Sequence, residues 1–314
     1  MRRKHRSRLL ILLFLMTFIL TGCTTYIKDD NNKRVVNEVT GQSVPANILC
    51  KPENQNLVNL YNKYDKNLEY KIADLPDCDD LKLYNSDSYS GLWAQLFVIP
   101  LAWYIVKVGE LVQNYGFAIM IVGLLIRLIL TPLTVKTAKQ SQNMKNAQPE
   151  LNKLEKKYKD KTDSDAMMKK SQEMMLIYKK YKVSPLGSCL VAFIQIPLFL
   201  AFLEAINRVP VIFEESLWTL QLGTTPLVGI KEGNYLYLIL IALIILTTYL
   251  SFKFNMNSMG SPAQEQQMKF MTNFMLIFIS IASFSLPTAI ALYWVTTNAF
   301  AVVQNFYIKK RSVT

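Results

Sequence analysis

The sequence predicts an all-α membrane protein with five transmembrane helices, an interfacial amphipathic helix and a cytoplasmic helical hairpin. The chain has 314 residues, of which 51% are hydrophobic and 18% are charged. This composition is too apolar for a soluble domain and too charged for a chain that lies wholly within the membrane. The apolar residues gather in runs long enough to cross a hydrocarbon layer of about 30 Å. The loops between these runs differ consistently in net charge.

Residues 1–22 predict a lipoprotein signal peptide. The basic segment MRRKHRSR is followed by the apolar segment LLILLFLMTFIL and then by Leu20-Thr21-Gly22-Cys23. These last four residues resemble a bacterial lipobox, which implies cleavage before Cys23 and attachment of a diacylglyceryl group to its thiol. The alternative is a plain signal anchor with an incidental cysteine. In both cases the residues that follow lie outside the cytoplasm.

Residues 23–90 are expected to be an extracytoplasmic tether or a small module. They are polar and rich in Asn, Asp and Lys, without strong periodicity, as in segments that bury little apolar surface. Cys50 and Cys78 lie in a compartment that permits oxidation. The sequence leaves open whether they form a disulfide or remain two thiols.

Residues 91–112 are predicted to form an amphipathic helix in the outer membrane interface. A glutamine and a proline interrupt its apolar part, and it ends in charged residues. Trp93, Trp103 and Tyr104 are expected at the level of the lipid headgroups, where amphipathic aromatic rings are enriched.

Residues 116–136 form the first predicted span, and Arg127 is its unusual residue. At about 1.5 Å per residue, Arg127 lies roughly 16 Å in from Gly116, near the middle of the hydrocarbon layer. A charge at this depth costs about 2.5–3.5 kcal/mol on insertion-based scales. Thr131 and Thr134 continue a polar stripe at i+4 and i+7, which predicts one wall of a hydrated groove. The alternatives are that Arg127 snorkels to the interface or pairs with a buried carboxylate.

The charge of the loops predicts the orientation of the membrane core. Residues 137–184 hold 12 lysines against 6 acidic residues, whereas residues 207–234 hold 2 basic and 3 acidic residues. By the positive-inside rule, residues 137–184 and the short basic tail 309–314 are cytoplasmic. The core, residues 113–308, is predicted to span the membrane at about 116–136, 186–203, 235–252, 270–286 and 288–308.

The cytoplasmic loop 137–184 is predicted to form a hairpin of two antiparallel helices. Leu151, Leu154 and Tyr158 follow a helical spacing, and a second helical pattern begins after the polar break at residues 161–164. The hairpin could be merely a solvated loop that obeys the positive-inside rule. It could instead be a docking platform, because methionines form adaptable apolar surfaces. The methionines on the second helix are Met167, Met168, Met174 and Met175.

Polar residues also occur in the second and last predicted spans. Gln195 precedes Pro197, whose missing amide frees a backbone carbonyl one turn earlier. Trp294 and Asn298 fall within a narrow arc of the last span at 100° per residue, with Thr297 beside them. They predict a second polar and aromatic face within the membrane.

Several function classes are excluded or disfavoured by the sequence. The only histidine, His5, lies in the predicted signal peptide, which excludes Ser-His-Asp catalysis and His-ligated metal sites in the mature chain. No metal, cofactor or enzymatic activity is expected, and the nucleotide-binding motif GxxxxGK[ST] is absent. A secondary transporter of a small anionic solute is the main alternative function, but such transporters usually contain internal repeats. A substrate-binding lipoprotein would keep more of its mass outside the membrane.

Four motifs carry a resemblance to a known family: IRLILTPLTVKTAKQSQNM, QPELNKLEKKYKD, SPLGSCLVAFIQIPLFLAF and LPTAIALYWVTTNAFAVVQNFYIKK. With these motifs, about residues 93–310 resemble the YidC/Oxa/Alb family of membrane protein insertases, in the lipoprotein form of Gram-positive-type bacteria. The resemblance implies five helices around a hydrophilic groove that is open to the cytoplasm and to lipid. It also implies insertion and folding of nascent membrane proteins without nucleotide hydrolysis.

The resemblance also implies functional residues, partners and a location. The family's groove arginine corresponds to Arg127, its groove glutamine to Gln195 and its aromatic residue of the last span to Trp294. Helix geometry alone adds Thr131 and Asn298 as groove residues. The expected clients are nascent membrane proteins with short acidic outer tails. The hairpin is expected to contact the Sec translocon, the signal recognition machinery or the ribosome, and the expected location is the bacterial cell membrane, with no direct nucleic-acid function.

Overall fold

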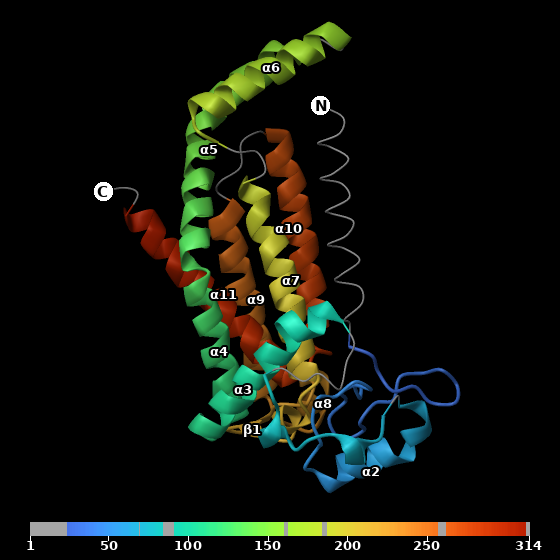
Figure 1. Ribbon diagram of the computed structural model, residues 1–314. Coiled ribbons are helices and arrows are strands. Elements are labelled where there is room, and N and C mark those ends of the chain that lie inside the picture. Colours follow the sequence, from blue (N-terminus) through green and yellow to red (C-terminus); the bar gives the residue numbers. More distant parts are fainter. Residues whose placement is uncertain are drawn as a thin grey trace. The chain divides into compact units, whose positions relative to one another are not determined.

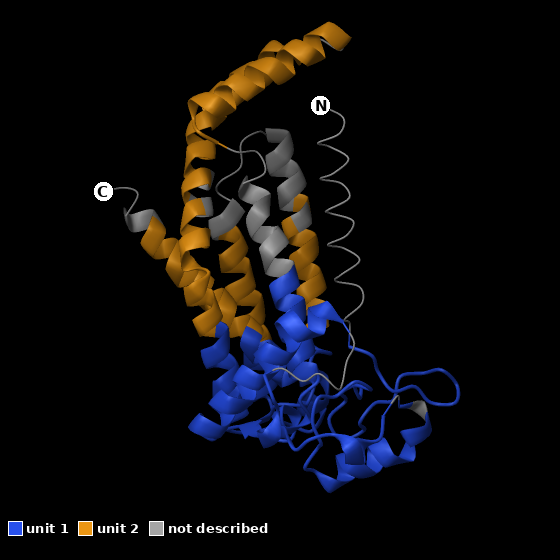
Figure 2. Ribbon diagram, viewed as in Figure 1, with its two compact units in different colours: residues 1–123, 196–240, 284–293 blue, residues 124–195, 241–283, 294–314 orange. Residues whose placement is uncertain are grey.

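The computed structural model describes residues 24–68, 70–83, 91–159, 163–183, 187–256 and 262–311, which are mostly helical (Figure 1). The chain divides into two compact units (Figure 2). Unit 1 comprises residues 1–123, 196–240 and 284–293, and unit 2 comprises residues 124–195, 241–283 and 294–314. The predicted signal peptide, residues 1–22, and the predicted lipidation site Cys23 lie outside the described residues.

Residues 24–83 of unit 1 form a small module with its own hydrophobic core. Its elements are α2 (Gln55–Lys63) and the 3-10 turns Asp65–Asn67, Ile72–Asp74 and Cys78–Asp80. The core residues are Ile27, Val35, Val44, Ile48, Tyr61, Ile72 and Leu75. Asn54 caps α2 by accepting hydrogen bonds from two backbone amides of the first turn. A disulfide joins Cys50 to Cys78. Of the two alternatives that the sequence left open, a packed core fits a module rather than a tether.

The next helical segment of unit 1 is a π-helical turn, Ala94–Val98, followed by α3 (Ile99–Val112). Trp93, predicted at the membrane interface, is instead buried, and its indole Nε1–H donates to Glu204 Oε1 at 3.3 Å. The prediction failed for Trp93 because the sequence gave no sign of a carboxylate partner from a distant segment. Tyr104 is exposed.

Two of the described helices are long and apolar enough to cross a membrane, Ala94–Val112 and Leu236–Lys253. Three further apolar helical segments are shorter, Tyr115–Ile129, Pro197–Asn207 and Thr272–Ala282. Within the described residues, these segments overlap the run that was predicted to lie in the interface and four of the five predicted spans, whereas the predicted span 288–308 is not among them.

The first predicted span, 116–136, is divided into two helices. α4 covers Tyr115–Ile129 and α5 covers Thr131–Lys157, with Leu130 between them. Pro132 has no backbone N–H and cannot continue the helical hydrogen-bond ladder, which explains an interruption at this point. The prediction of one uninterrupted helix was wrong because an apolar run does not report a local break in the backbone.

The loop between the second and third predicted spans packs against the N-terminal module within unit 1. It contains the end of α7 (Gly187–Asn207), the 3-10 turn Pro210–Phe213, the antiparallel pair β1 (Ser216–Leu217) and β2 (Leu220–Gln221), and α8 (Pro226–Lys231). Arg208 is 1% exposed, and its Nε–H donates to the carbonyl of Asn47 at 2.7 Å. The amide of Leu49 donates in turn to the carbonyl of Arg208 at 2.7 Å. The module is therefore docked through buried backbone and guanidinium hydrogen bonds.

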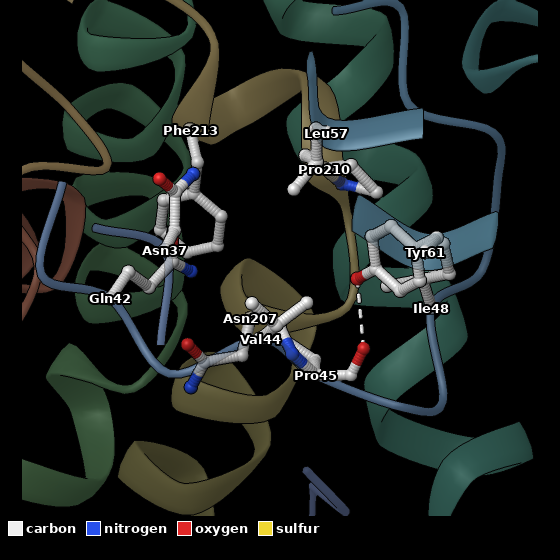
Figure 3. Close-up of a pocket in the computed structure, with 10 residues that line it drawn as sticks. All are labelled: Asn37, Gln42, Val44, Pro45, Ile48, Leu57, Tyr61, Asn207, Pro210 and Phe213. Carbon is white, nitrogen blue, oxygen red and sulfur yellow. Dashed lines mark hydrogen bonds between the residues drawn. The ribbon is translucent and has the colours of Figure 1, made fainter. Parts of the chain in front are cut away.

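A small cavity marks this docking surface (Figure 3). Its volume is about 10 Å³, and module residues such as Val44 and Tyr61 line it together with Asn207, Pro210 and Phe213. The hydroxyl of Tyr61 donates to the carbonyl of Pro45 at 2.8 Å. A cavity of this size holds about one water molecule, which excludes this site as a binding pocket for a larger ligand.

Unit 2 contains the hairpin of α5 (Thr131–Lys157) and α6 (Ser164–Lys180) and most of three later helices. These are α9 (Leu236–Met256), α10 (Pro262–Ala282) and α11 (Thr288–Arg311), although α9 and α11 also contribute residues to unit 1. α5 packs against α6 (Ser164–Lys180) through two apolar clusters, one around Met144, Ala147 and Leu151 and the other around Leu154, Tyr158 and Ala166. α6 begins at Ser164, the last residue of the predicted polar break, and the side chain of Asp163 caps it by accepting from the amide of Ala166.

Candidate functional site

Arg127 lies in the last turn of α4 and is half-buried. Its helical neighbours Leu125, Leu128 and Ile129 are exposed, so the surface beside it is apolar. The hydroxyl of Thr131 donates to the backbone carbonyl of Arg127 at 3.0 Å, which satisfies a carbonyl at the end of α4. The guanidinium of Arg127 therefore belongs to a helix end that also carries the hydroxyl of Thr131.

A glutamine cluster, defined by Thr131, Thr134 and Gln304, links α5 to α11 within unit 2. Gln304 Nε2 donates to Thr131 Oγ1 at 3.0 Å and to Thr134 Oγ1 at 2.9 Å. Both threonine hydroxyls donate to backbone carbonyls in their own segment. The cluster continues the polar stripe that begins at Arg127.

A tryptophan cluster, defined by Thr248, Trp294 and Asn298, links α9 to α11 within the same unit. The indole Nε1–H of Trp294 donates to Thr248 Oγ1 at 2.9 Å, and Asn298 Nδ2 donates to the same oxygen at 3.4 Å. Thr248 is 1% exposed, whereas Trp294 and Asn298 are half-buried. The structure therefore brings the two predicted groove residues of α11 together on one buried hydroxyl.

The two clusters occupy different faces of α11. At 100° per residue, Asn298 lies about 40° from Trp294, whereas Gln304 lies about 80° away on the opposite side. α11 thus presents polar groups to α5 and to α9 at once. Hydroxyl, amide and indole groups can exchange hydrogen bonds with a passing polar segment, and the guanidinium of Arg127 adds a positive charge.

Gln304 and Thr248 belong to this site but were missed by sequence reasoning. Gln304 lies seven residues after Thr297, which was already on the predicted polar side of the last span. A search at i+7 would therefore have found it. Thr248 belongs to the pair Thr247-Thr248 in an otherwise apolar helix, and this pair was a usable signal.

The other predicted groove and docking residues are Gln195 of α7 and four methionines of α6, and none of them is part of these two clusters. Gln195 falls within α7, but its side chain is not among the described ones. Met167, Met168 and Met175 are exposed on α6, whereas Met174 packs against both clusters of the hairpin. Met167 and Met174 also line a hollow of about 300 Å³ along α5 and α6.

The helices α4, α9 and α11 differ from the hairpin in their content of acidic residues. α4, α9 and α11 contain no aspartate or glutamate. Acidic residues are instead frequent on the hairpin, where Glu150 accepts hydrogen bonds from Lys180 and Tyr181, and Glu173 pairs with Lys157 at 2.7 Å. The hydrogen bond from Lys180 is the main cause that lowers the pKa of Glu150.

Comparisons with known proteins match most of the chain. A family model described as 60Kd inner membrane protein matches residues 107–314. The membrane protein insertase YidC of Oceanobacillus iheyensis is 37% identical over 238 residues, which cover 75% of this chain and 91% of that protein. The membrane protein insertase MisCA of Bacillus subtilis is 34% identical over 236 residues, which cover 75% of this chain and 86% of that protein.

A solved structure supports the fold. It is described as an active YidC insertase crystal structure with the first transmembrane domain resolved, and its TM-score to this chain is 0.50 at 22% identity. The match covers 71% of this chain and 48% of the solved chain. The module at residues 24–83 lies before the region that the family model matches.

Proposed function

We propose a mechanism of insertion for this chain, which belongs to the YidC family of membrane protein insertases. Its task is to insert nascent integral membrane proteins into the bilayer. The mechanism concerns how a polar outer tail of such a client crosses the hydrocarbon layer. Unaided transfer of each charged group through the layer costs several kcal/mol.

The residues of the glutamine and tryptophan clusters line a hydrated groove that opens to the cytoplasm and to lipid. The single observation that carries this proposal is the gathering of polar side chains from α5 and α9 around α11 in unit 2. Thr131, Trp294 and Asn298 contribute from positions that the sequence already indicated, and Gln195 of α7 is proposed to join them. Water in such a groove shortens the apolar path that the client's tail must cross.

Arg127 attracts an acidic tail into this groove. Two opposite unit charges 4 Å apart attract each other by about 1 kcal/mol in bulk water and about 4 kcal/mol at an effective dielectric constant of 20. A wet groove lies between these limits, so the carboxylate of the client is held briefly and then released. Because the attraction is electrostatic and needs no fixed geometry, lysine should partly replace Arg127, and alanine should not.

Release of the client is driven by burial of its apolar segment in lipid. Each Å² of apolar surface removed from water contributes about 25 cal/mol, so a segment of membrane-spanning length supplies far more than the groove's attraction. Nucleotide hydrolysis is therefore unnecessary, and no catalytic step is assigned. The polar groove also shelters the client while it folds, which gives the chain a chaperone role.

The proposed membrane arrangement has five spans, formed by α4 with the start of α5, and by α7, α9, α10 and α11. The module at residues 24–83 lies outside, tethered to the bilayer by a lipid on Cys23, with α3 in the outer interface. The hairpin and the C-terminal end of α11 are cytoplasmic. The exposed methionines of α6 are proposed to contact the Sec translocon, the signal recognition machinery or the ribosome.

Site-specific photo-crosslinking tests this mechanism. A photoreactive amino acid replaces Thr131 or Asn298, and a stalled client with a short acidic tail is presented to the protein in membranes. Leu246, which is exposed on the apolar helix α9, is the matched control position. The tail should crosslink at Thr131 and Asn298 and remain unlinked at Leu246. Equal crosslinking at all three positions, or none at the two polar ones, would contradict the groove.

A further inference from the structure

The turn between β1 and β2 carries the most unusual exposed side chain of unit 1. Trp218 is 80% exposed, and its backbone has a φ of +54°. A positive φ is uncommon for residues other than glycine and is unfavourable for a bulky side chain. The turn therefore holds a large aromatic residue in solvent in a conformation that glycine would adopt more easily.

Hydrogen bonds from two helices hold this turn in place. Asn114, just before α4, donates its side-chain Nδ2–H to the carbonyl of Ser216 at 3.0 Å. Asn234, just before α9, donates its Nδ2–H to the carbonyl of Thr219 at 2.8 Å. Both residues that flank the turn, Leu217 and Leu220, are buried. The base of the hairpin is thus fixed at the ends of α4 and α9, and the indole is its large exposed side chain.

The indole belongs to an exposed apolar band at these helix ends. Phe117 of α4 is 41% exposed, and its ring lies edge-on to Trp218 with centroids 6.5 Å apart. Tyr235 and Leu236 are exposed at the start of α9, and Leu111 is exposed at the end of α3. α9 continues this band with the exposed Leu238 and Ile239. Exposed apolar side chains therefore extend from the start of α9 along a helix that is long enough to span the membrane.

We propose that Trp218 is an outer-leaflet anchor whose indole inserts at the boundary between lipid headgroups and acyl chains. Tryptophan is enriched at this depth because its ring is apolar and its N–H can still reach a polar partner. The fixed hairpin presents the ring without the entropy cost of ordering a flexible loop. Arg127 lies ten residues after Phe117 on the same helix, so an anchor beside Phe117 would help to set the depth of α4.

Lipid fits this surface better than a protein partner. The exposed residues named above are aromatic or aliphatic. The acidic residues beside the turn, Glu214 and Glu215, are half-buried, and Glu215 accepts a hydrogen bond from the amide of Tyr115 at 2.7 Å. The proposal rests on the proposed orientation, in which residues 207–234 are outside the cytoplasm. It does not depend on the groove or on Arg127.

Tryptophan fluorescence in vesicles tests the anchor with the full chain. Emission of the wild type minus emission of Trp218→Phe isolates the contribution of Trp218, because phenylalanine keeps an apolar ring at the turn. The protein is reconstituted in phosphatidylcholine and phosphatidylglycerol vesicles whose lipids carry bromine either in the upper acyl chain or near its end. Iodide is the aqueous quencher. Subtraction of Trp93→Phe gives the matched control, since the ring of Trp93 is buried in protein.

The emission of Trp218 should be shifted to the blue of indole in water and should lose most of its intensity with upper-chain bromine. Iodide should have little effect on Trp218, and both quenchers should spare Trp93. Water-like emission that iodide quenches would overturn the anchor, and this is the result expected if the band were reserved for a protein partner. Insertion of an acidic-tailed client is measured with the same vesicles. If the wild-type protein inserts the client but iodide quenches Trp218, the anchor alone is rejected. If lipid bromine quenches Trp218 but the wild-type protein fails to insert the client, the proposed insertion mechanism is rejected and the anchor stands.

Discussion

Replacing Arg208 by alanine should release the N-terminal module from the loop that follows α7. Arg208 is almost fully buried and donates to the carbonyl of Asn47 at 2.7 Å. A hydrogen bond that involves a charged group contributes about 1.5–3 kcal/mol. Since about 1.4 kcal/mol corresponds to a tenfold change, the undocked population should rise about 10- to 150-fold. Glu204, which is also buried, lies one turn earlier, within α7.

Hydrogen exchange at the amide of Leu49 measures this undocking directly. That amide donates to the backbone carbonyl of Arg208, which remains in the alanine variant, so its exchange reports docking rather than the lost side chain. Arg34→Ala is the matched control, because Arg34 is an exposed arginine of the same module. Faster exchange at Leu49 in Arg208→Ala alone is expected. Unchanged exchange, or an equal rise in both variants, would refute the claim that Arg208 holds the module in place.

Two further predictions concern unit 2. Gln304→Leu removes two hydrogen bonds to threonine hydroxyls, which contribute about 1 kcal/mol each. The thermal unfolding midpoint of this variant should therefore fall by several degrees. The control Gln172→Leu, on the exposed face of α6, should leave the midpoint nearly unchanged. Glu150→Gln should speed hydrogen exchange in α6 at neutral pH, because Glu150 accepts hydrogen bonds from Lys180 and Tyr181. These bonds lower the pKa of Glu150 from its ordinary value of 4.5, so their contribution is present above that value and is lost as the pH falls below it. Wild type and variant should therefore converge in acid, and a difference that persists there would show that another interaction is responsible.

The helices and the polar face of the last span could be predicted because both depend on local periodicity. Trp294 and Asn298 are one helical turn apart, and the structure places both on Thr248. Arg127 and Thr131 were found in the same way, as a cation and a hydroxyl at i+4 in an apolar run. Gln304 was missed because the polar pattern was followed from Trp294 and not from Thr297, on whose side of α11 Gln304 lies.

The structure of the N-terminal module could not be predicted from local patterns. Its core joins Ile27, Val35 and Val44 to Tyr61 and to residues beyond α2, and these positions follow no helical or strand period. Docking through Arg208 depends on backbone carbonyls, which leave no trace in the side-chain sequence. The sequence therefore did not predict that residues 24–83 form a module with a buried core.

The break at Leu130 shows that hydropathy alone does not predict where a helix is interrupted. Pro132 was visible in the sequence, but the apolar run around it extended to residue 136. Hydropathy averages over a whole segment, whereas a proline acts on one or two hydrogen bonds of the backbone. The interruption places Arg127 in the last turn of α4, where the helix end leaves backbone carbonyls to be satisfied by neighbours such as Thr131.

The proposed mechanism depends on the positive charge of Arg127, which attracts the acidic tails of clients within the membrane. The most direct measurement compares wild type, Arg127→Lys and Arg127→Ala in proteoliposomes, using one single-span client whose short outer tail is either acidic or neutral. The acidic client should insert with lysine at a rate between those of wild type and alanine, and with alanine at least about tenfold more slowly than with wild type, as expected when about 1.4 kcal/mol or more of attraction is lost. The neutral client should be affected far less. Equal insertion of the acidic client by the alanine variant and the wild type would contradict the central claim.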